Sequence, residues 1–179
     1  MYKLIILDRD GVINEDSSEF VKSPAEWKAI PGSLEAIAKL NKANIKVVVA
    51  SNQSGLARGY FSLETLSEIH EKMCRELSAV GGHLDGIFFC PHGPGEDCTC
   101  RKPKPGLILK IAKLFAVNPK EILSIGDSLR DILAAKAAGC NAWLVKTGNG
   151  LYTLSVADQE LDGIPVFEDL AAAVDEVLS

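Results

Sequence analysis

The sequence predicts an α/β protein built on a doubly wound, parallel, Rossmann-like sheet. Short apolar runs such as Leu4–Leu7 and residues 47–49 are typical of strands that are buried on both faces, as in a parallel sheet. Segments with apolar residues at helical spacing separate these runs, and such crossovers connect parallel strands. Polar clusters directly follow several of the runs, and α/β sheets bind ligands at the carboxyl ends of their strands.

A single domain over residues 1–179 is expected, because 179 residues are enough for one well-filled core. The net charge of −5 argues against nucleic acid or an anionic membrane as a partner. No apolar run approaches the roughly 20 residues that span a bilayer, and Asp8, Arg9 and Asp10 interrupt the first run. We therefore expect a cytoplasmic protein and, without an obvious exposed apolar stripe, a monomer.

The first half of the chain is expected to hold three strands. After the opening strand, residues 15–27 have few periodic apolar positions and predict a surface loop. Ser33 is the expected N-cap of a helix that Asn44 closes. Ser62 begins a longer helix, which the glycines at 81 and 82 end. The other strands in this half are expected at residues 45–50 and 86–90.

The second half of the chain is also expected to alternate strands and helices. A long loop covers residues 91–105, Asn118 and Pro119 mark a capped turn, and Gly139 is placed to follow the end of a helix. The expected elements are a helix at 107–114, a strand at 122–125, a helix at 129–138, a strand at 142–145, a sixth strand at 166–167 and a closing helix at 170–178.

Four polar clusters lie at the carboxyl ends of expected strands, which meet at one rim of a parallel sheet. Carboxylates there suit Mg²⁺, hydroxyl and amide groups donate to phosphate oxygens, and cationic side chains neutralise phosphate charge. Phosphoryl transfer needs mainly such positioning and charge stabilisation. The clusters are Asp8 with Asp10, Ser51 with Asn52, Arg101 with Lys102, and Asp127.

The loop after the third strand carries a candidate zinc site. Cys90, His92, Cys98 and Cys100 form a Cys₃His set, which suits tetrahedral Zn²⁺. A disulfide across the short span from Cys98 to Cys100 would be strained, and the cytoplasm disfavours it. Four protein ligands leave no open position, so the zinc would be structural. It would hold in place the loop that brings Arg101 and Lys102 to the rim.

Four motifs then occur in a diagnostic order. They are Asp8-Arg9-Asp10-Gly11-Val12, the strand-end Ser51, a lysine before the fourth strand, and Gly126-Asp127-Ser128-Leu129-Arg130-Asp131. Together they resemble the motifs of the haloacid dehalogenase-like phosphatases. The resemblance extends from the first strand to Gly148.

This resemblance implies a two-step phosphoryl transfer. Asp8 would attack phosphorus and form an aspartyl-phosphate. Asp10 would protonate the leaving alcohol and then activate the water that hydrolyses the intermediate. Ser51 would bind the transferring phosphoryl group, and Lys102 would steady its charge.

The resemblance also implies a magnesium site. Mg²⁺ would be held by Asp8, the backbone carbonyl of Asp10, and Asp127. Asp131, in the following helical turn, would support the site rather than bind the metal. Only residues 15–31 are available for an insertion after the first motif, so we expect a capless domain with a fairly open site.

The zinc loop followed by Arg101-Lys102-Pro103 resembles two neighbouring families, the heptose bisphosphate phosphatases and the histidinol-phosphate phosphatases. This match favours Lys102 over Lys104 as the lysine of the site. Residues 10–14, 51–55 and 101–106 look more like the heptose family. The short loop between the second and third zinc ligands looks more like the histidinol family.

The heptose resemblance implies removal of the 7-phosphate from D-glycero-D-manno-heptose 1,7-bisphosphate, on the route to the nucleotide-activated heptose of lipopolysaccharide. The partner would then be a small sugar bisphosphate. Asn52 and Arg101, together with Asp16 and Glu19 in the first loop, would contact the substrate. The alternative is histidinol phosphate, in histidine biosynthesis.

A hypothesis of another class is a zinc-stabilised module that binds phosphate ligands without turnover. The presence of both Asp8 and Asp10 argues against it, because binding alone does not need an acid/base beside a nucleophile.

Several other residues are expected to be structural. They are His70 as a packed histidine, and Cys74, Cys140 and Trp143 as core residues, while Arg58 and Arg130 are either solvated helix charges or reach the rim.

Overall fold

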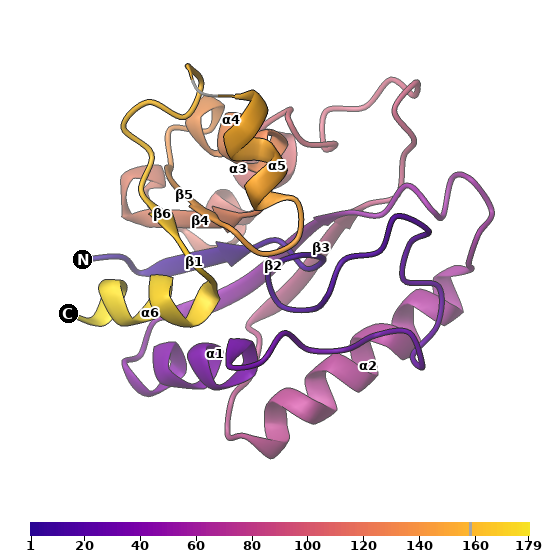
Figure 1. The fold of residues 1–179 in the computed structure, drawn as a ribbon, viewed down its shortest axis with the longest axis horizontal. Helices are drawn as coiled ribbons and strands as arrows, with labels where there is room; N and C mark the ends of the chain where they lie inside the picture. Colours follow the sequence, from indigo (N-terminus) through magenta and orange to yellow (C-terminus); the bar gives the residue numbers. More distant parts are fainter. Residues whose placement is uncertain (158) are drawn as a thin grey trace.

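The computed structural model describes residues 1–157 and 159–179. Among these residues, six parallel strands form one sheet in the order β3-β2-β1-β4-β5-β6 (Figure 1). The predicted doubly wound parallel sheet is therefore confirmed. The strands are β1 (Leu4–Leu7), β2 (Lys46–Asn52), β3 (Gly86–Cys90), β4 (Ile122–Gly126), β5 (Asn141–Val145) and β6 (Val166–Phe167).

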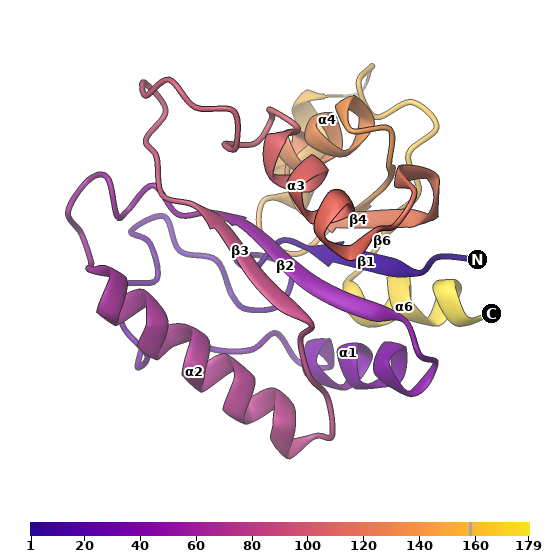
Figure 2. The same ribbon diagram turned by 180° about the vertical axis from the view of Figure 1, so that it is seen from behind.

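Helices cover both faces of the sheet, as Figures 1 and 2 show from opposite sides. One layer holds α1 (Ser33–Lys42), α2 (Leu63–Ala79) and α6 (Leu170–Leu178). The other holds α3 (Gly106–Phe115), α4 (Leu129–Ala137) and α5 (Gly150–Val156). A short 3₁₀ turn, η1 (Pro119–Glu121), leads into β4.

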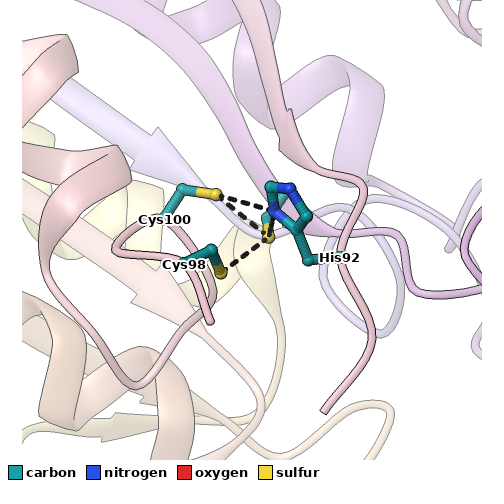
Figure 3. Close-up of side chains that lie close together, drawn as sticks. His92, Cys98 and Cys100 are labelled. Carbon is teal, nitrogen blue, oxygen red and sulfur yellow. Dashed lines mark hydrogen bonds between the residues drawn. The ribbon is translucent and has the colours of Figure 1, made fainter. Parts of the chain in front are cut away.

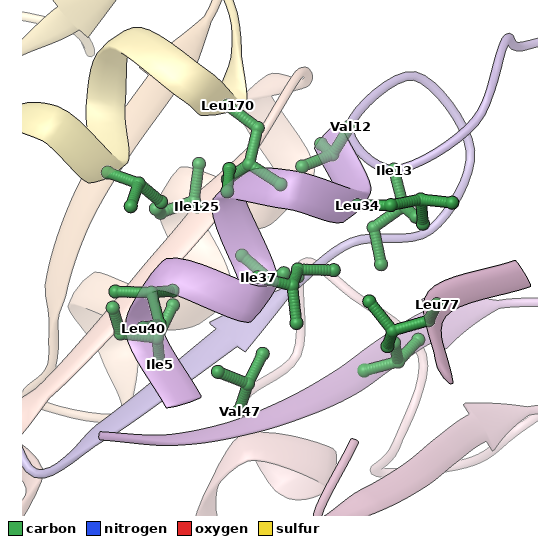
Figure 4. Packing of buried hydrophobic residues seen from close by; sticks show 14 of the residues in the cluster. Ile5, Val12, Ile13, Leu34, Ile37, Leu40, Val47, Leu77, Ile125 and Leu170 are labelled. Carbon is green, nitrogen blue, oxygen red and sulfur yellow. The ribbon is translucent and has the colours of Figure 1, made fainter. Parts of the chain in front are cut away.

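Strand β1 contributes residues to both hydrophobic cores. Its residues alternate between the two cores, with Ile5 and Leu7 facing the α1 layer and Leu4 and Ile6 facing the α3 layer. All four are at most 1% exposed, as expected for a central strand buried on both faces. Figure 4 shows Ile5 packed with Ile37 and Leu40 of α1 in the first core.

The strand order positions the site. The chain leaves β1 toward β2 and β3 on one side, and later crosses to β4, β5 and β6 on the other. The order therefore reverses between β1 and β4, and a crevice opens at the carboxyl ends of strands at such a switch point. Asp8 immediately follows β1 there, and its backbone N–H donates to the carbonyl of Ile125 in β4 (3.0 Å).

Three local predictions were wrong. Gly32, with φ of 83°, is the N-cap of α1, and Ser33 is the first helical residue. The Ser33 hydroxyl instead donates to the carbonyl of Ile13 (2.6 Å), so it ties the first loop to the helix. Cys74 is exposed, and Trp143 is only partly buried.

The loop 15–27 also departs from the prediction, because it is not wholly at the surface. Trp27 is fully buried in the α1 layer. Lys72 of α2 donates to the carbonyls of Pro24 and Trp27 (2.8 Å each), so the loop is attached to that helix. Within the described residues, no helix combines the length and the apolar character needed to cross a membrane.

Candidate active site

A cavity of about 320 Å³ lies at the switch point between β1 and β4. Its walls come from the loops that follow the strands, and charged and amide side chains predominate. The lining residues are Asp8, Asp10, Asp16, Ser17, Phe20, Val21, Asn52, Gln53, Ser54, Arg58, Pro94, Arg101, Lys102, Asp127, Ser128, Arg130, Asp131 and Asn149.

A buried lysine links the end of β1 with strand β2 and the start of α4. The Lys102 ammonium lies 3.0 Å from Asp8 Oδ1 and 2.6 Å from Asp131 Oδ1, and it donates to the carbonyl of Ala50 (2.8 Å). Three acceptors match the three N–H bonds of an ammonium group. Lys104 is exposed, and its ammonium donates to the carbonyl of Cys98. The structure thus places Lys102, rather than Lys104, beside the candidate nucleophile.

Three carboxylates crowd around this lysine. Oxygens of Asp8, Asp127 and Asp131 all lie within 4.8 Å of one another. Burial, with repulsion from neighbouring carboxylates and despite Lys102, raises the pKa of Asp8 to about 7. Burial and the charges of Asp8 and Asp131 raise the pKa of Asp127 to about 8. Such a hard-oxygen set suits a divalent cation, which would favour the ionised carboxylates.

Asp131 differs from the other two carboxylates. Burial acts to raise its pKa, but the charge and hydrogen bond of Lys102 and a hydrogen bond from Ser128 lower it overall. Asp131 Oδ2 accepts from the backbone N–H (3.0 Å) and the hydroxyl (2.6 Å) of Ser128. Both of its oxygens therefore have protein partners, which fits a supporting role better than metal ligation.

Two glycines let Asp127 reach the rim. Gly11 and Gly148 both have positive φ, and a Cβ at either position would lie 2.1–2.2 Å from Asp127 Oδ2. The same oxygen accepts from the backbone N–H of Asn149 (2.7 Å) and from its side chain (3.2 Å). The carboxylate is therefore confined between two backbones and one amide.

Asp10 lines the cavity beside Asp8. Its carboxylate accepts hydrogen bonds from Arg9, Asn14 and Gln53. Gln53 also donates to the buried Ser51 hydroxyl (2.6 Å), so one amide links two of the predicted site residues.

The Asn52 side chain also belongs to the cavity wall, but its amide is engaged by the protein. Its Nδ2 donates to the carbonyl of Lys102 and its Oδ1 accepts from the Lys102 N–H, both at 3.0 Å. Asn52 therefore fixes the backbone of the lysine. This contact differs from the substrate contact expected for it.

Three arginines, Arg58, Arg101 and Arg130, line the same cavity as the carboxylates. Burial lowers the pKa of Arg101, and the nearby charges of Arg130 and Arg58 lower it further. None of the three guanidinium groups forms an ion pair with a described residue. Arg101 donates to the carbonyl of His92 (3.1 Å), and the Arg58 guanidinium lies over the ring of Phe20. Arg58 and Arg130 therefore reach the rim.

The first loop contributes unevenly. Asp16 lines the cavity and accepts from the Asn149 side chain (2.7 Å). Glu19 is exposed and does not line the cavity; its backbone carbonyl accepts from Lys22 (3.0 Å). The structure therefore brings Asp16, but not Glu19, to the site.

The four predicted zinc ligands converge at the end of β3 and in the loop that follows it, and Figure 3 labels three of them, His92, Cys98 and Cys100. Cys90 Sγ lies 3.2 Å from Cys100 Sγ, 3.9 Å from Cys98 Sγ and 3.4 Å from His92 Nδ1. All three cysteines are free thiols. Two thiolates at about 2.3 Å from a tetrahedral zinc are about 3.8 Å apart, so the cluster fits that ion.

The family follows from a model for haloacid dehalogenase-like hydrolases, which matches residues 18–139. The chain is a haloacid dehalogenase-like hydrolase. The family predicted from the four motifs is thereby confirmed. Its fold places the strand-end carboxylates, the lysine and Asp127 at one cavity.

Relatives of this hydrolase match it over nearly the whole chain. A Bordetella bronchiseptica protein named D-glycero-beta-D-manno-heptose-1,7-bisphosphate 7-phosphatase is 56% identical over 98% of each chain. A Pseudomonas aeruginosa protein of the same name is 46% identical over 98% of this chain and 97% of its own. The crystal structure of the D,D-heptose 1,7-bisphosphate phosphatase from B. bronchiseptica, complexed with magnesium and phosphate, has a TM-score of 0.96 over 98% of each chain.

Sequence reasoning missed several residues of this hydrolase's site. Asn14 and Gln53 bind Asp10, and Asn149 joins Asp127 to Asp16. Each is an amide in a polar stretch that follows an expected strand, and that position was the available signal. Which carboxylate each amide would contact depends on how separate loops meet in the fold.

Proposed function

We propose that this hydrolase is a Mg²⁺-dependent phosphatase that removes the 7-phosphate of D-glycero-β-D-manno-heptose 1,7-bisphosphate. This reaction would supply the route to the activated heptose of lipopolysaccharide. The observation that carries the proposal is one cavity lined both by carboxylates with Lys102 and by three arginines. The names of relatives at 56% and 46% identity support the substrate.

The first step is attack of Asp8 on the 7-phosphate. An Asp8 oxygen forms a bond to phosphorus as the bond from phosphorus to the sugar oxygen breaks, which gives an aspartyl-phosphate. The electron pair of the broken bond stays on the sugar oxygen, which takes a proton from Asp10. Lys102, 3.0 Å from Asp8, offsets the negative charge that gathers around the phosphoryl group.

The second step returns the enzyme to its starting state. Asp10 takes a proton from water as the water oxygen attacks the phosphorus of the aspartyl-phosphate, and Asp8 leaves as a carboxylate. One water is consumed, and inorganic phosphate and the sugar monophosphate are released. Ser51, linked to Asp10 through Gln53, would donate to a phosphoryl oxygen.

Magnesium would be held by Asp8, the backbone carbonyl of Asp10, and Asp127. When bound, the ion favours ionised carboxylates and neutralises the charge of the phosphoryl group. The chain's own contribution is to confine Asp127 between Gly11 and Gly148, and to direct Lys102 toward Asp8.

A second phosphate on the substrate explains the three arginines. A monoester with one phosphate would use the carboxylates and Lys102, and Arg58, Arg101 and Arg130 would remain without an ion-pair partner among the described residues. Arginine binds phosphate through paired N–H donors. We assign the phosphate at carbon 1 to this group, with Asp16 available for sugar hydroxyls.

The zinc site would affect the position of Arg101 without taking part in the chemistry. Zn²⁺ held by Cys90, His92, Cys98 and Cys100 has no open coordination position. The carbonyl of His92 accepts from Arg101, so the geometry of the metal loop determines where that guanidinium lies.

The test is to compare kcat/KM with Mg²⁺ for the two anomers of heptose 1,7-bisphosphate and for histidinol phosphate. We expect the β anomer to exceed histidinol phosphate by at least about 10³-fold, because histidinol phosphate lacks the second anion that the arginines bind. A preference for histidinol phosphate would overturn the substrate while keeping the reaction. Absence of Mg²⁺-dependent phosphate release from every substrate, in zinc-replete folded protein, would favour a binding module without turnover.

A further inference from the structure

In the sequence, Arg9 stands between Asp8 and Asp10, the two proposed catalytic aspartates. The Arg9 side chain is fully buried, and its only ion pair among the described residues is with Asp10. A buried charge is costly unless it is paired and fully hydrogen-bonded. The proposed phosphatase chemistry assigns Arg9 no role, so its contacts show what it does.

The Arg9 guanidinium donates hydrogen bonds to both oxygens of the Asp10 carboxylate. Arg9 Nε and Nη2 donate to Oδ1 at 3.1 and 2.9 Å, and Nη2 also donates to Oδ2 at 3.0 Å. Asn14 donates to Oδ1 (2.8 Å) and Gln53 to Oδ2 (3.1 Å). Oδ1 therefore has three donors, which leaves Oδ2 as the oxygen with the greater capacity to exchange a proton.

The other terminal nitrogen of the same guanidinium, Nη1, contacts a histidine of α2. Arg9 Nη1 lies 3.4 Å from His70 Nε2. Arginine has only donors, so Nε2 must be the unprotonated, accepting nitrogen of a neutral ring. His70 also packs against Phe89 of β3. Burial and the Arg9 charge lower the pKa of His70 to about 4, which agrees with a neutral ring.

We propose that Arg9 and His70 are positioning residues for Asp10, with His70 fixing the guanidinium and the guanidinium fixing the carboxylate that moves the proton. The proposal rests on the acid/base role of Asp10 in the proposed function. In the first step Oδ2 gives its proton to the sugar oxygen as the bond to phosphorus breaks. In the second step it takes a proton from the attacking water.

The test compares His70→Leu, which removes the acceptor, with His70→Gln, whose amide oxygen can accept from Arg9. For the sugar bisphosphate we expect kcat of His70→Leu to fall about tenfold or more with KM nearly unchanged, because acid–base catalysis is impaired and binding is not. His70→Gln should retain most of the wild-type kcat.

A leaving-group comparison separates positioning from a structural defect. With 4-nitrophenyl phosphate the leaving group needs little acid help, so the aspartyl-phosphate still forms, but its hydrolysis still needs Asp10 as a base. His70→Leu should then show a burst approaching one 4-nitrophenolate per active site, followed by slow turnover. Ile69→Val, which removes one buried methylene from the same helix, is the control for a structural defect. Its burst and its kcat should equal those of the wild-type enzyme, even if its Tm changes.

Asp10→Asn distinguishes the two possible failures. If Asp10→Asn turns over like wild type, the acid/base role in the proposed function is wrong. If Asp10→Asn is impaired while His70→Leu keeps the wild-type kcat and burst, the positioning role of His70 is overturned and the proposed function stands. If His70→Leu does not fold, the test uses Arg9→Lys, which keeps the positive charge but loses the paired donors. Arg9→Lys should then show the burst and slow turnover expected of His70→Leu, and wild-type kinetics in this variant would overturn the proposal.

Discussion

The carboxylate cluster at the rim and the thiol–imidazole cluster in the loop after β3 both gather metal ligands within 4.8 Å, but they are built in different ways. The zinc ligands all come from residues 90–100, whereas the carboxylates come from the ends of β1 and β4 and the start of α4. The thiol–imidazole cluster has four protein ligands, which would fill a tetrahedral site, whereas the carboxylate cluster opens into a cavity. In the proposed function the local cluster serves structure, and the cluster assembled by the fold serves chemistry.

The two clusters are joined by two residues of sequence. Cys100 is followed directly by Arg101 and Lys102, and the latter contacts Asp8 and Asp131. Lys102 is held by Asp8, Asp131 and the Ala50 carbonyl, whereas Arg101 donates to the carbonyl of His92 in the loop. We therefore expect metal in the loop to affect substrate binding more than the chemical step, and metal at the rim to do the reverse.

The largest expected effect is at the rim. Asp8→Asn removes the nucleophile while keeping the shape of the side chain, so kcat should fall on the order of 10⁴-fold or more. Steady-state kinetics with the sugar bisphosphate measures the loss, and circular dichroism with zinc analysis checks that fold and loop are intact. Substantial remaining turnover in folded protein would refute the nucleophile role.

The next effect should appear in the loop. Cys98→Ser removes one of four zinc ligands, so zinc affinity should fall about 100-fold or more, together with Tm. Because Arg101 is anchored to His92, KM should rise several-fold while kcat changes less. Zinc content, Tm and kinetics are measured on the same preparation. Unchanged zinc stoichiometry would mean that the site is misassigned; Cys74→Ser, at an exposed thiol outside the loop, is the control.

The same contrast between local and assembled features explains what the sequence predicts well. Strand β3 has the predicted bounds, because a short apolar run before a polar loop is recognisable without knowledge of its neighbours. The four candidate zinc ligands were predicted for the same reason, and the structure brings them together. The rim carboxylates were predicted to lie close together because a parallel sheet must bring strand ends together.

The missed features all depend on contacts across the fold. The sequence of α5, Gly150–Val156, has weak helix signals, and its Thr153 hydroxyl donates to the backbone carbonyl of Asp127 (3.0 Å). Trp27 lies in a polar stretch, and its burial depends on α2. His70 could be predicted as packed, but its partner Arg9 is fixed only by the approach of α2 to β1.

The smallest predicted effect is a change of stability with pH in metal-free protein, and it belongs to the rim alone. The pKa values of Asp8 and Asp127, about 7 and about 8, exceed the unfolded value, which is about 3.9. The native state therefore holds more protons than the unfolded state, and stability falls as pH rises through these values. Between pH 6.5 and 8 the loss should be on the order of 2 kcal/mol.

The chosen window separates this effect from two others. His70, whose pKa is lowered to about 4, makes stability rise with pH only below its unfolded value of about 6.5. Asp131, whose pKa is lowered, contributes stability that is already present above about pH 4. Mg²⁺ competes with protons for the ionised carboxylates, so its addition should raise Tm more at pH 8 than at pH 6.5. Asp127→Asn should reduce both the fall of metal-free Tm with pH and the larger effect of Mg²⁺ at pH 8. If the metal-free Tm of the wild-type protein does not fall between pH 6.5 and 8, the carboxylates are already ionised without metal.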